Sequence, residues 1–293
     1  MEPPVRRIFL LLLFAISIQA QDAPRKIEPT WLRRDVAALQ EHPTDIATPT
    51  CHYTPVFGEG DSEAKLPVTF TRFGVLTIDA NGACKPATYP LIEELLFVRD
   101  GAASMRYADE THALTPDDFT YIPPTVAHTL SNPNAQPAHL VLISSKISPK
   151  TTLAAAPKLT VANLRELNEQ VVGGHPSSVL YKLMIGPRVT ARDRINATYG
   201  IADFFLMDFA PGGTNFPHHH ENAEEIYLVL DGEGQMSAGS GMDGIQGLHP
   251  AKAGDAYYFR VNCTVGFYAA NKPDAKAHIL AVRAYVDYPK NWD

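Results

Sequence analysis

Short strand-like segments, repeated in two blocks along the chain, constrain the fold most. From Leu66 onward, segments rich in β-branched and aromatic residues are separated by turn signals such as "DANG", "RDG" and "NPNAQP", a spacing typical of a β-sandwich or barrel. The block recurs, because "LFVRDG" (residues 96–101) matches "YLVLDG" (227–232) and "DDFTYIPPTVAH" (117–128) matches "GDAYYFRVNCTV" (254–265). We therefore predict one β-barrel duplicated in tandem; two unrelated β domains are the alternative.

Two polar segments outside these blocks each predict one helix. The segment before the first block contains the short amphipathic piece "TWLRRDVAALQEH", which we interpret as a helix in an arm laid over the body. The segment between the blocks predicts an interdomain helix that begins at Thr160, a capping residue, and ends at a glycine pair. Leu164, Leu167 and Val171 lie on its apolar face.

The first twenty residues have the pattern of a secretory signal peptide. Arg6 and Arg7 precede an apolar run that is shorter than the roughly 20 residues of a membrane-spanning helix. We expect cleavage after Ala20, no membrane association of the mature chain, and a secreted or periplasmic location. The predicted division of the chain is a signal peptide at residues 1–20, an arm at 21–65, the first barrel at 66–150, a linker helix at 151–178 and the second barrel at 179–293.

Charge and cysteine content narrow the class further. The net charge of −7 without an extended basic run gives no electrostatic footprint for nucleic acid. Three cysteines are too few for a disulfide-built scaffold, but an oxidising compartment permits one bridge. Cys51 with Cys84 is the candidate pair, although sequence does not fix their distance; Cys263 is left over.

The segment "GGTNFPHHHENAEEIYLVLDGEG" contains the candidate metal ligands. Alternate residues of a strand share a face, so His218 and His220 point the same way and His219 points away. Glu225 begins the next strand-like segment and can return a carboxylate to the same place. Two imidazoles and one carboxylate suit a divalent metal such as Mn, Fe, Zn or Ni. We expect His219 and Glu224 to be exposed or to lie beside the ligands.

The spacing of this segment resembles a known family. Gly212-x5-His218-x-His220-x4-Glu225-x6-Gly232 is similar to the first sequence motif of the cupin superfamily at every position. With two blocks, the chain resembles a bicupin over about residues 66 to 285. The resemblance implies an all-β fold of two tandem jelly-roll barrels.

The second cupin motif normally supplies a fourth ligand, a histidine, and the second block lacks it. Val265 stands in the histidine position, and the other departures from the motif are Arg260, Asn262 and Ala269. Cys263 is two residues from that position and is a weaker candidate ligand. The predicted site therefore consists of His218, His220 and Glu225.

The first block keeps the histidine of the second motif and lacks the two histidines of the first motif. It keeps Glu94 and His128 but has Ala87 and Tyr89 where the resemblance calls for histidines. We predict that the first barrel binds no metal and that His128 is a core histidine bonded to Glu94. The segment around His128 is also similar to ureidoglycine aminohydrolase-type bicupins, but the second block lacks that group's E-x-H-x3-H pattern.

These observations predict an exported bicupin that binds one divalent metal in its C-terminal barrel and acts on a small polar molecule. Oxygenation, isomerisation and hydrolysis of a small acid or sugar derivative are the candidate reaction classes, since one fold supports many chemistries. The alternative is a non-catalytic small-molecule-binding bicupin with a vestigial metal site. No residue is identified as catalytic, and a duplicated barrel leaves the oligomeric state open.

Overall fold

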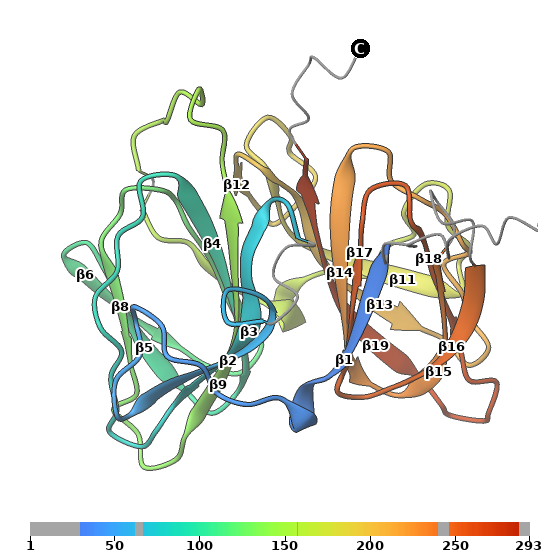
Figure 1. The fold of residues 1–293 in the computed structure, drawn as a ribbon, viewed down its shortest axis with the longest axis horizontal. Helices are drawn as coiled ribbons and strands as arrows, with labels where there is room; N and C mark the ends of the chain where they lie inside the picture. The colour runs from blue at the N-terminus through green and yellow to red at the C-terminus, as the bar shows by residue number, and fades with distance from the viewer. Residues whose placement is uncertain (1–29, 62–66, 157, 240–245, 287–293) are drawn as a thin grey trace, which may run out of the picture.

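The chain folds into two β-barrels that lie side by side, as the computed structural model shows (Figure 1). The structure describes residues 30–61, 67–156, 158–239 and 246–286; the predicted signal peptide lies outside them. Each barrel consists of one large and one three-stranded sheet, so the prediction of tandem jelly-roll barrels is confirmed. None of the helices among the described residues is long and apolar enough to cross a membrane.

The large sheet of the first barrel has six strands in the order β10-β7-β4-β9-β3-β2. In that order their bounds are Val161–Asn163, Asp118–Ile122, Ile92–Asp100, Ala138–Lys146, Phe70–Ile78 and Cys51–Gly58. The facing sheet, in the order β6-β5-β8, comprises Glu110–Leu114, Ala103–Tyr107 and His128–Ser131.

The large sheet of the second barrel has seven strands in the order β1-β17-β14-β19-β13-β11-β12. In that order their bounds are Trp31–Asp35, Asp255–Phe259, Ala223–Asp231, Ala277–Tyr285, Ile201–Phe209, Val179–Pro187 and Ile195–Thr198. The facing sheet, β16-β15-β18, comprises Gln246–Lys252, Glu233–Gly239 and Thr264–Ala269. The two matched sequence blocks therefore occupy the same places in their barrels, β4 with β14 and β7 with β17.

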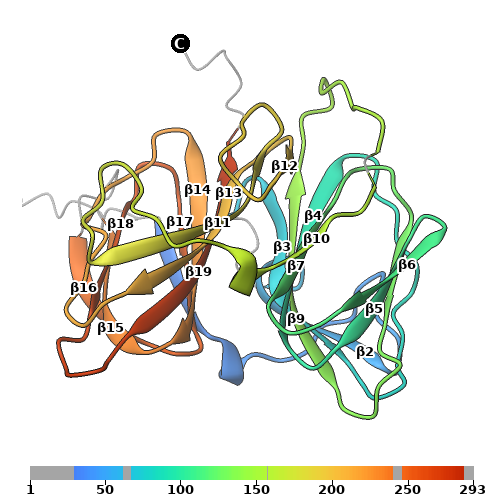
Figure 2. The same cartoon turned by 180° about the vertical axis from the view of Figure 1, so that it is seen from behind.

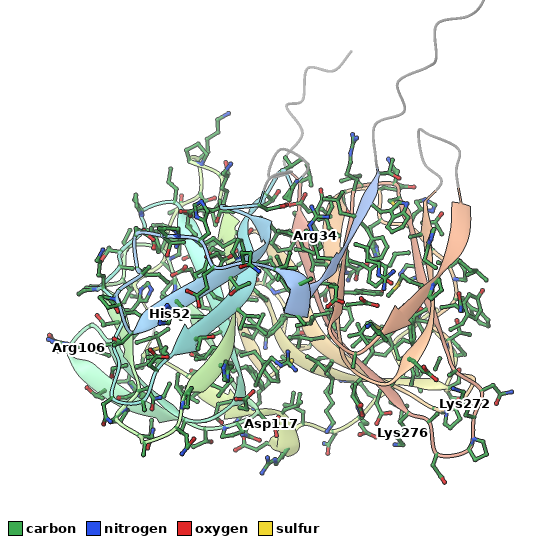
Figure 3. All side chains as sticks on the ribbon, turned by 60° about the horizontal axis from the view of Figure 1, so that its bottom comes forward. Arg34, His52, Arg106, Asp117, Lys272 and Lys276 are labelled. Atoms are coloured by element: carbon green, nitrogen blue, oxygen red, sulfur yellow. A yellow bond between two sulfur atoms is a disulfide. The ribbon has the colours of Figure 1, made fainter. Side chains whose placement is uncertain are left out.

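The large sheets face each other between the barrels, which explains why their central strands are apolar on both faces. Strand β4 is buried along almost its whole length, as expected for a sheet covered on both sides. One apolar cluster joins residues of both barrels across this interface, for example Phe57 with Tyr258, whose rings are 5.9 Å apart. Separate clusters fill the interior of each barrel. Charged side chains such as Arg106, Lys272 and Lys276 lie at the outer edges (Figure 3).

The predicted helix in the N-terminal arm is wrong. The segment forms strand β1, followed by a single 3-10 turn at Val36–Ala38. Strand β1 is antiparallel to β17 and so belongs to the second barrel, whereas β2, also within the predicted arm, pairs with β3 of the first. Pairing with a free sheet edge outweighs the weak helical periodicity of so short a segment.

The predicted interdomain helix is also wrong, because the segment forms a short strand and a single 3-10 turn. Thr160 precedes strand β10, which pairs with β7 of the first barrel, and only one 3-10 turn follows, at Leu164–Glu166. Leu164 is buried as predicted, but Val171 is exposed, so the expected single apolar face does not form. Figure 2, a view from behind, shows this segment between the two barrels.

Cys51 and Cys84 form a disulfide, with their Cα atoms 5.0 Å apart. Cys51 lies in β2, and Cys84 lies in the loop before β4. The candidate pairing from the sequence is thereby confirmed. It ties strand β2 to the loop whose backbone pairs with β8 of the opposite sheet.

Candidate metal centre

The loop between β13 and β14 brings the three predicted ligands together. The backbone of His218 exchanges two hydrogen bonds with Val265 of β18, at 2.9 and 2.8 Å, which holds the loop against the barrel wall. One donor atom from each of His218, His220 and Glu225 lies within 4.8 Å of the others. His219 is exposed as expected, although residues 218–220 lie in a loop with one isolated bridge at His218 and not in a regular strand.

The His218 ring is held in one tautomer by the backbone. Its Nδ1 lies 2.8 Å from the carbonyl oxygen of Phe216, and because a carbonyl only accepts hydrogen bonds, Nδ1 carries the proton. Nε2 therefore has its lone pair available, as in histidines that bind metals. Burial lowers the pKa of His218, which favours the neutral, metal-binding form.

Glu225 supplies a buried oxygen that is not satisfied. Its side chain is about 2% exposed, and Oε2 lies 3.2 Å from Nε2 of His220 without making a hydrogen bond of good geometry to the described residues. Burial alone would raise the pKa of Glu225, but His220, Arg283 and His218 outweigh it and lower the pKa below its usual value. A buried carboxylate oxygen that converges with two imidazoles fits a cation.

Sequence analysis missed the charged residues that surround this triad. Arg283 of β19 places Nη1 at 3.0 Å from Nδ1 of His220 and pairs through Nη2 with Asp203 of β13. Arg192 pairs with both Asp203 and Asp193. The only signal in the sequence is a charge inside an apolar segment, Arg283 in "HILAVRAYV" and Asp203 in "GIADFFLM".

The prediction that Glu224 is exposed or lies beside the ligands is wrong. It lies on the opposite face of β14 from Glu225 and is fully buried at the interface between the barrels. Its carboxylate accepts three hydrogen bonds from backbone amides of residues 68–70 and one from Tyr258. The residue is a structural acceptor and is neither exposed nor close to the candidate ligands.

Each barrel lacks a candidate metal ligand at a position where the other barrel has a histidine. His218 bridges Val265 in the second barrel just as Ala87 bridges His128 in the first. The fourth position of the second site is thus a buried valine, about 1% exposed, within the apolar cluster of the barrel interior. Cys263 lies outside the group of three ligands, and its sulfur contacts the carbonyl oxygen of Gly239 at 3.5 Å.

The corresponding place in the first barrel is closed by protein groups. His128 Nε2 lies 3.0 Å from Oε2 of Glu94, as predicted, and Ser144 donates to the other carboxylate oxygen. Tyr89, in the position of His220, bonds to Arg72 and Asp45. The remaining cavity is only about 10 Å³, so the first barrel has neither the ligands nor the space of the second.

A small cavity opens onto the candidate ligands of the second barrel. Its volume is about 40 Å³, enough for at least one water molecule. It is lined by the triad, by apolar and aromatic side chains, and by Arg192, Asp203, Arg283 and His175. The space suits a very small polar molecule next to an ion.

The family follows from a match that covers both barrels. The model of the cupin domain matches residues 75–144 and again residues 205–283. The chain belongs to the cupin superfamily. As a two-domain cupin, it has the same barrel twice, and the two matched segments run from β3 to β9 and from β13 to β19. No curated protein matches the sequence significantly.

Solved bicupin structures share this fold at low sequence identity. A protein from Pseudomonas aeruginosa named for its induction by glyoxylate is 18% identical, with a TM-score of 0.70 over 92% of this chain and 96% of its own. The protein Ylba from E. coli is 20% identical, with a TM-score of 0.66 over 89% and 93%. An oxalate decarboxylase from Lactobacillus farciminis, solved with formate, is 10% identical, with a TM-score of 0.63 over 87% and 86%. At these identities the likeness concerns the fold.

Proposed function

We propose that this two-domain cupin binds one divalent metal ion through His218, His220 and Glu225 and acts on a small acid bound beside it. The observation that carries the proposal is the convergence of two imidazoles and one buried carboxylate, whose ligand atoms lie within 4.8 Å of one another beside a small cavity. Two nitrogens and one oxygen suit Mn, Fe, Zn and Ni alike. Three protein ligands leave positions open for water or substrate.

The bound ion would supply Lewis acidity, and the chain supplies the rest of the site. Arg283 lies beside His220, with Nη1 3.0 Å from Nδ1, and Arg192 and Asp203 line the cavity with it. Because both arginines are paired with aspartates, the added charge of a divalent ion would make the site net positive, which favours an acid over a neutral sugar derivative. The buried Val265 and its apolar neighbours keep bulk water from the fourth position. Oxygenation, isomerisation and hydrolysis remain the proposed reaction classes.

A non-catalytic binding protein is the second candidate, and Val265 favours it. With a hydrocarbon in place of the fourth ligand, the ion is held by fewer protein bonds and is exchanged more readily. The cavity would then capture a small molecule without converting it. Turnover of a bound small acid distinguishes the two candidates.

We also propose that the mature chain is exported to a periplasmic or extracellular location. The signal-peptide pattern of residues 1–20 supports this. The Cys51–Cys84 disulfide supports it independently, because such bridges persist in oxidising compartments. Cell fractionation of the full-length chain tests the proposal: release of a mature form that begins after Ala20 is expected, and retention of the full-length chain in the cytoplasm would contradict it.

Metal analysis of the mature chain, residues 21–293, tests the central proposal. We expect one divalent ion per chain after purification without chelator, and loss of that ion in the His218→Ala/His220→Ala variant. His219→Ala is the matched control, since this exposed histidine of the same run should not affect metal content. Wild-type protein that takes up no stoichiometric metal would overturn the proposal. Oxygen consumption and product analysis with a panel of small acids then separate the reaction classes.

A further inference from the structure

His175 is a third histidine at this site, and it comes from outside the barrel strands. It lies in the segment between the 3-10 turn at Leu164–Glu166 and β11. Its ring is 5.1 Å from the ring of His218 and 5.3 Å from that of Tyr181. The side chain lines the same cavity as the triad. No cupin motif marks this position, so its presence follows from the geometry alone.

The backbone fixes the tautomer of His175. Its Nδ1 lies 2.8 Å from the carbonyl oxygen of Asn215, which can only accept, so Nδ1 carries the proton and Nε2 of the neutral ring is an acceptor. The next residue, Phe216, holds His218 in the same way and has a positive φ of 52°. One strained turn therefore orients both rings. Asn215 anchors the turn through its buried side chain, which contacts Tyr227 and the amide of Phe267.

The position of His175 suits contact with a bound molecule better than contact with the ion. The ligand atoms of the triad lie within 4.8 Å of one another, and His175 is not in that group. It is nevertheless in ring contact with His218 and lines the cavity. An acceptor at this distance can receive a hydrogen bond from whatever occupies the ion's open position.

The charged wall of the cavity, formed by Arg192, Asp203 and Arg283, carries a donor without an acceptor. Nε of Arg283 is buried and has no hydrogen-bond partner among the described residues. Buried donors of this kind are rare and call for an acceptor. A carboxylate oxygen at the ion would provide one, and Arg283 is the side chain that also contacts His220.

The charges around the cavity favour a molecule with one negative charge. Arg192 and Arg283 are paired with Asp193 and Asp203, so Glu225 leaves one negative charge beside the neutral imidazoles. A divalent ion would change this to one positive charge. A monoanion then neutralises the buried site, which avoids the cost of an unpaired buried charge.

We propose that the cavity takes a small hydroxy acid. Its carboxylate binds at the ion and accepts a hydrogen bond from Arg283 Nε, and its hydroxyl donates to Nε2 of His175. This inference rests on the proposed metal site and specifies the substrate class for it. The small volume of the cavity, about 40 Å³, favours a short acid.

Binding of glycolate and acetate to the Mn-loaded mature chain, measured by calorimetry, tests the assignment of His175. Glycolate differs by one hydroxyl, and we expect the wild type to prefer it. His175→Phe keeps a ring but removes the acceptor, so the glycolate-to-acetate affinity ratio should fall about three- to tenfold, the effect of one hydrogen bond. Chelation of the ion by the hydroxyl contributes to both proteins and cancels in this comparison.

The metal content of each protein is measured in parallel and separates the two proposals. Wild-type protein without metal would overturn the proposed function itself. Metal-loaded wild type with an unchanged ratio in His175→Phe would overturn the hydroxy-acid assignment alone. His175→Gln keeps an acceptor oxygen and should retain part of the preference, a rescue that a merely structural role of His175 does not explain. Loss of the ion from His175→Phe would also contradict the assignment, because it would make His175 a ligand.

Discussion

At the residue scale, the candidate ligands were predictable and their surroundings were not. His218, His220 and Glu225 lie within eight residues of one another, so strand alternation and the family spacing are enough to group them. Arg283 and His175 reach the same cavity from distant parts of the chain. No local pattern encodes which strands become neighbours, so these contacts emerge only from the fold.

The buried pair of His128 and Glu94 gives a prediction about pH. Burial by itself lowers the pKa of His128, but the hydrogen bond and the charge of Glu94 outweigh it, and the net shift is upward. A raised pKa in the folded state adds stability that is complete below the unfolded value of about 6.5 and is lost as the pH rises through the folded value. The wild type should therefore have a higher free energy of unfolding than His128→Gln, and this difference should be larger at pH 6 than at pH 9.

Urea denaturation of both proteins at several pH values measures this difference. His219→Gln is the control, since it replaces an exposed histidine and should not change the dependence of stability on pH. If the difference between wild type and His128→Gln stays constant from pH 6 to pH 9, the pair is not responsible for the dependence of stability on pH. Because His128 belongs to the first barrel, metal in the second does not enter the comparison.

At the element scale, the strands of the duplicated blocks were predicted correctly, whereas the two connecting segments were predicted as helices and form strands with short 3-10 turns. The strands within each block show their own periodicity and turn signals. In contrast, β1 and β10 are short segments whose structure depends on the edges they meet, β17 and β7. Their equivalent places show that the first strand of each repeat completes the barrel of the other repeat, an exchange that local sequence does not reveal.

The disulfide between Cys51 and Cys84 should be a major stabilising feature of the first barrel. The two residues are 33 apart in sequence, and closing a loop of that length stabilises the folded state by about 3–4 kcal/mol in the chain-entropy model. Reductant should therefore lower the melting temperature of the wild type but not that of Cys51→Ala/Cys84→Ala. Cys263→Ala is the control, because Cys263 takes no part in the bridge. Equal sensitivity of the double variant and the wild type to reductant would refute the prediction.

At the scale of the whole molecule, the barrels are joined by a core and by two reciprocal carboxylates. Glu93 of the first barrel accepts hydrogen bonds from the amides of residues 199–201 in the second and from Tyr121. Glu224 of the second accepts from the amides of residues 68–70 in the first and from Tyr258. These contacts are equivalent. Each repeat supplies one carboxylate, and each also supplies the backbone segment that binds the carboxylate of the other repeat. The duplication therefore includes the interface as well as the barrels.

Substitution of either carboxylate should destabilise both barrels together. Each oxygen of Glu93 and Glu224 accepts from at least one backbone amide, so the NH₂ group of a glutamine would face a backbone N–H group that can only donate. Glu93→Gln and Glu224→Gln should each lower the free energy of unfolding by about 2–4 kcal/mol. The matched controls Tyr121→Phe and Tyr258→Phe remove one of the four hydrogen bonds and should each cost about 1 kcal/mol. Calorimetry of the four variants should still show one cooperative transition at a lower temperature, because a large apolar core also spans the interface. Glutamine variants as stable as the phenylalanine variants would show that the carboxylates do not hold the barrels together, and separate transitions would show that they alone couple them.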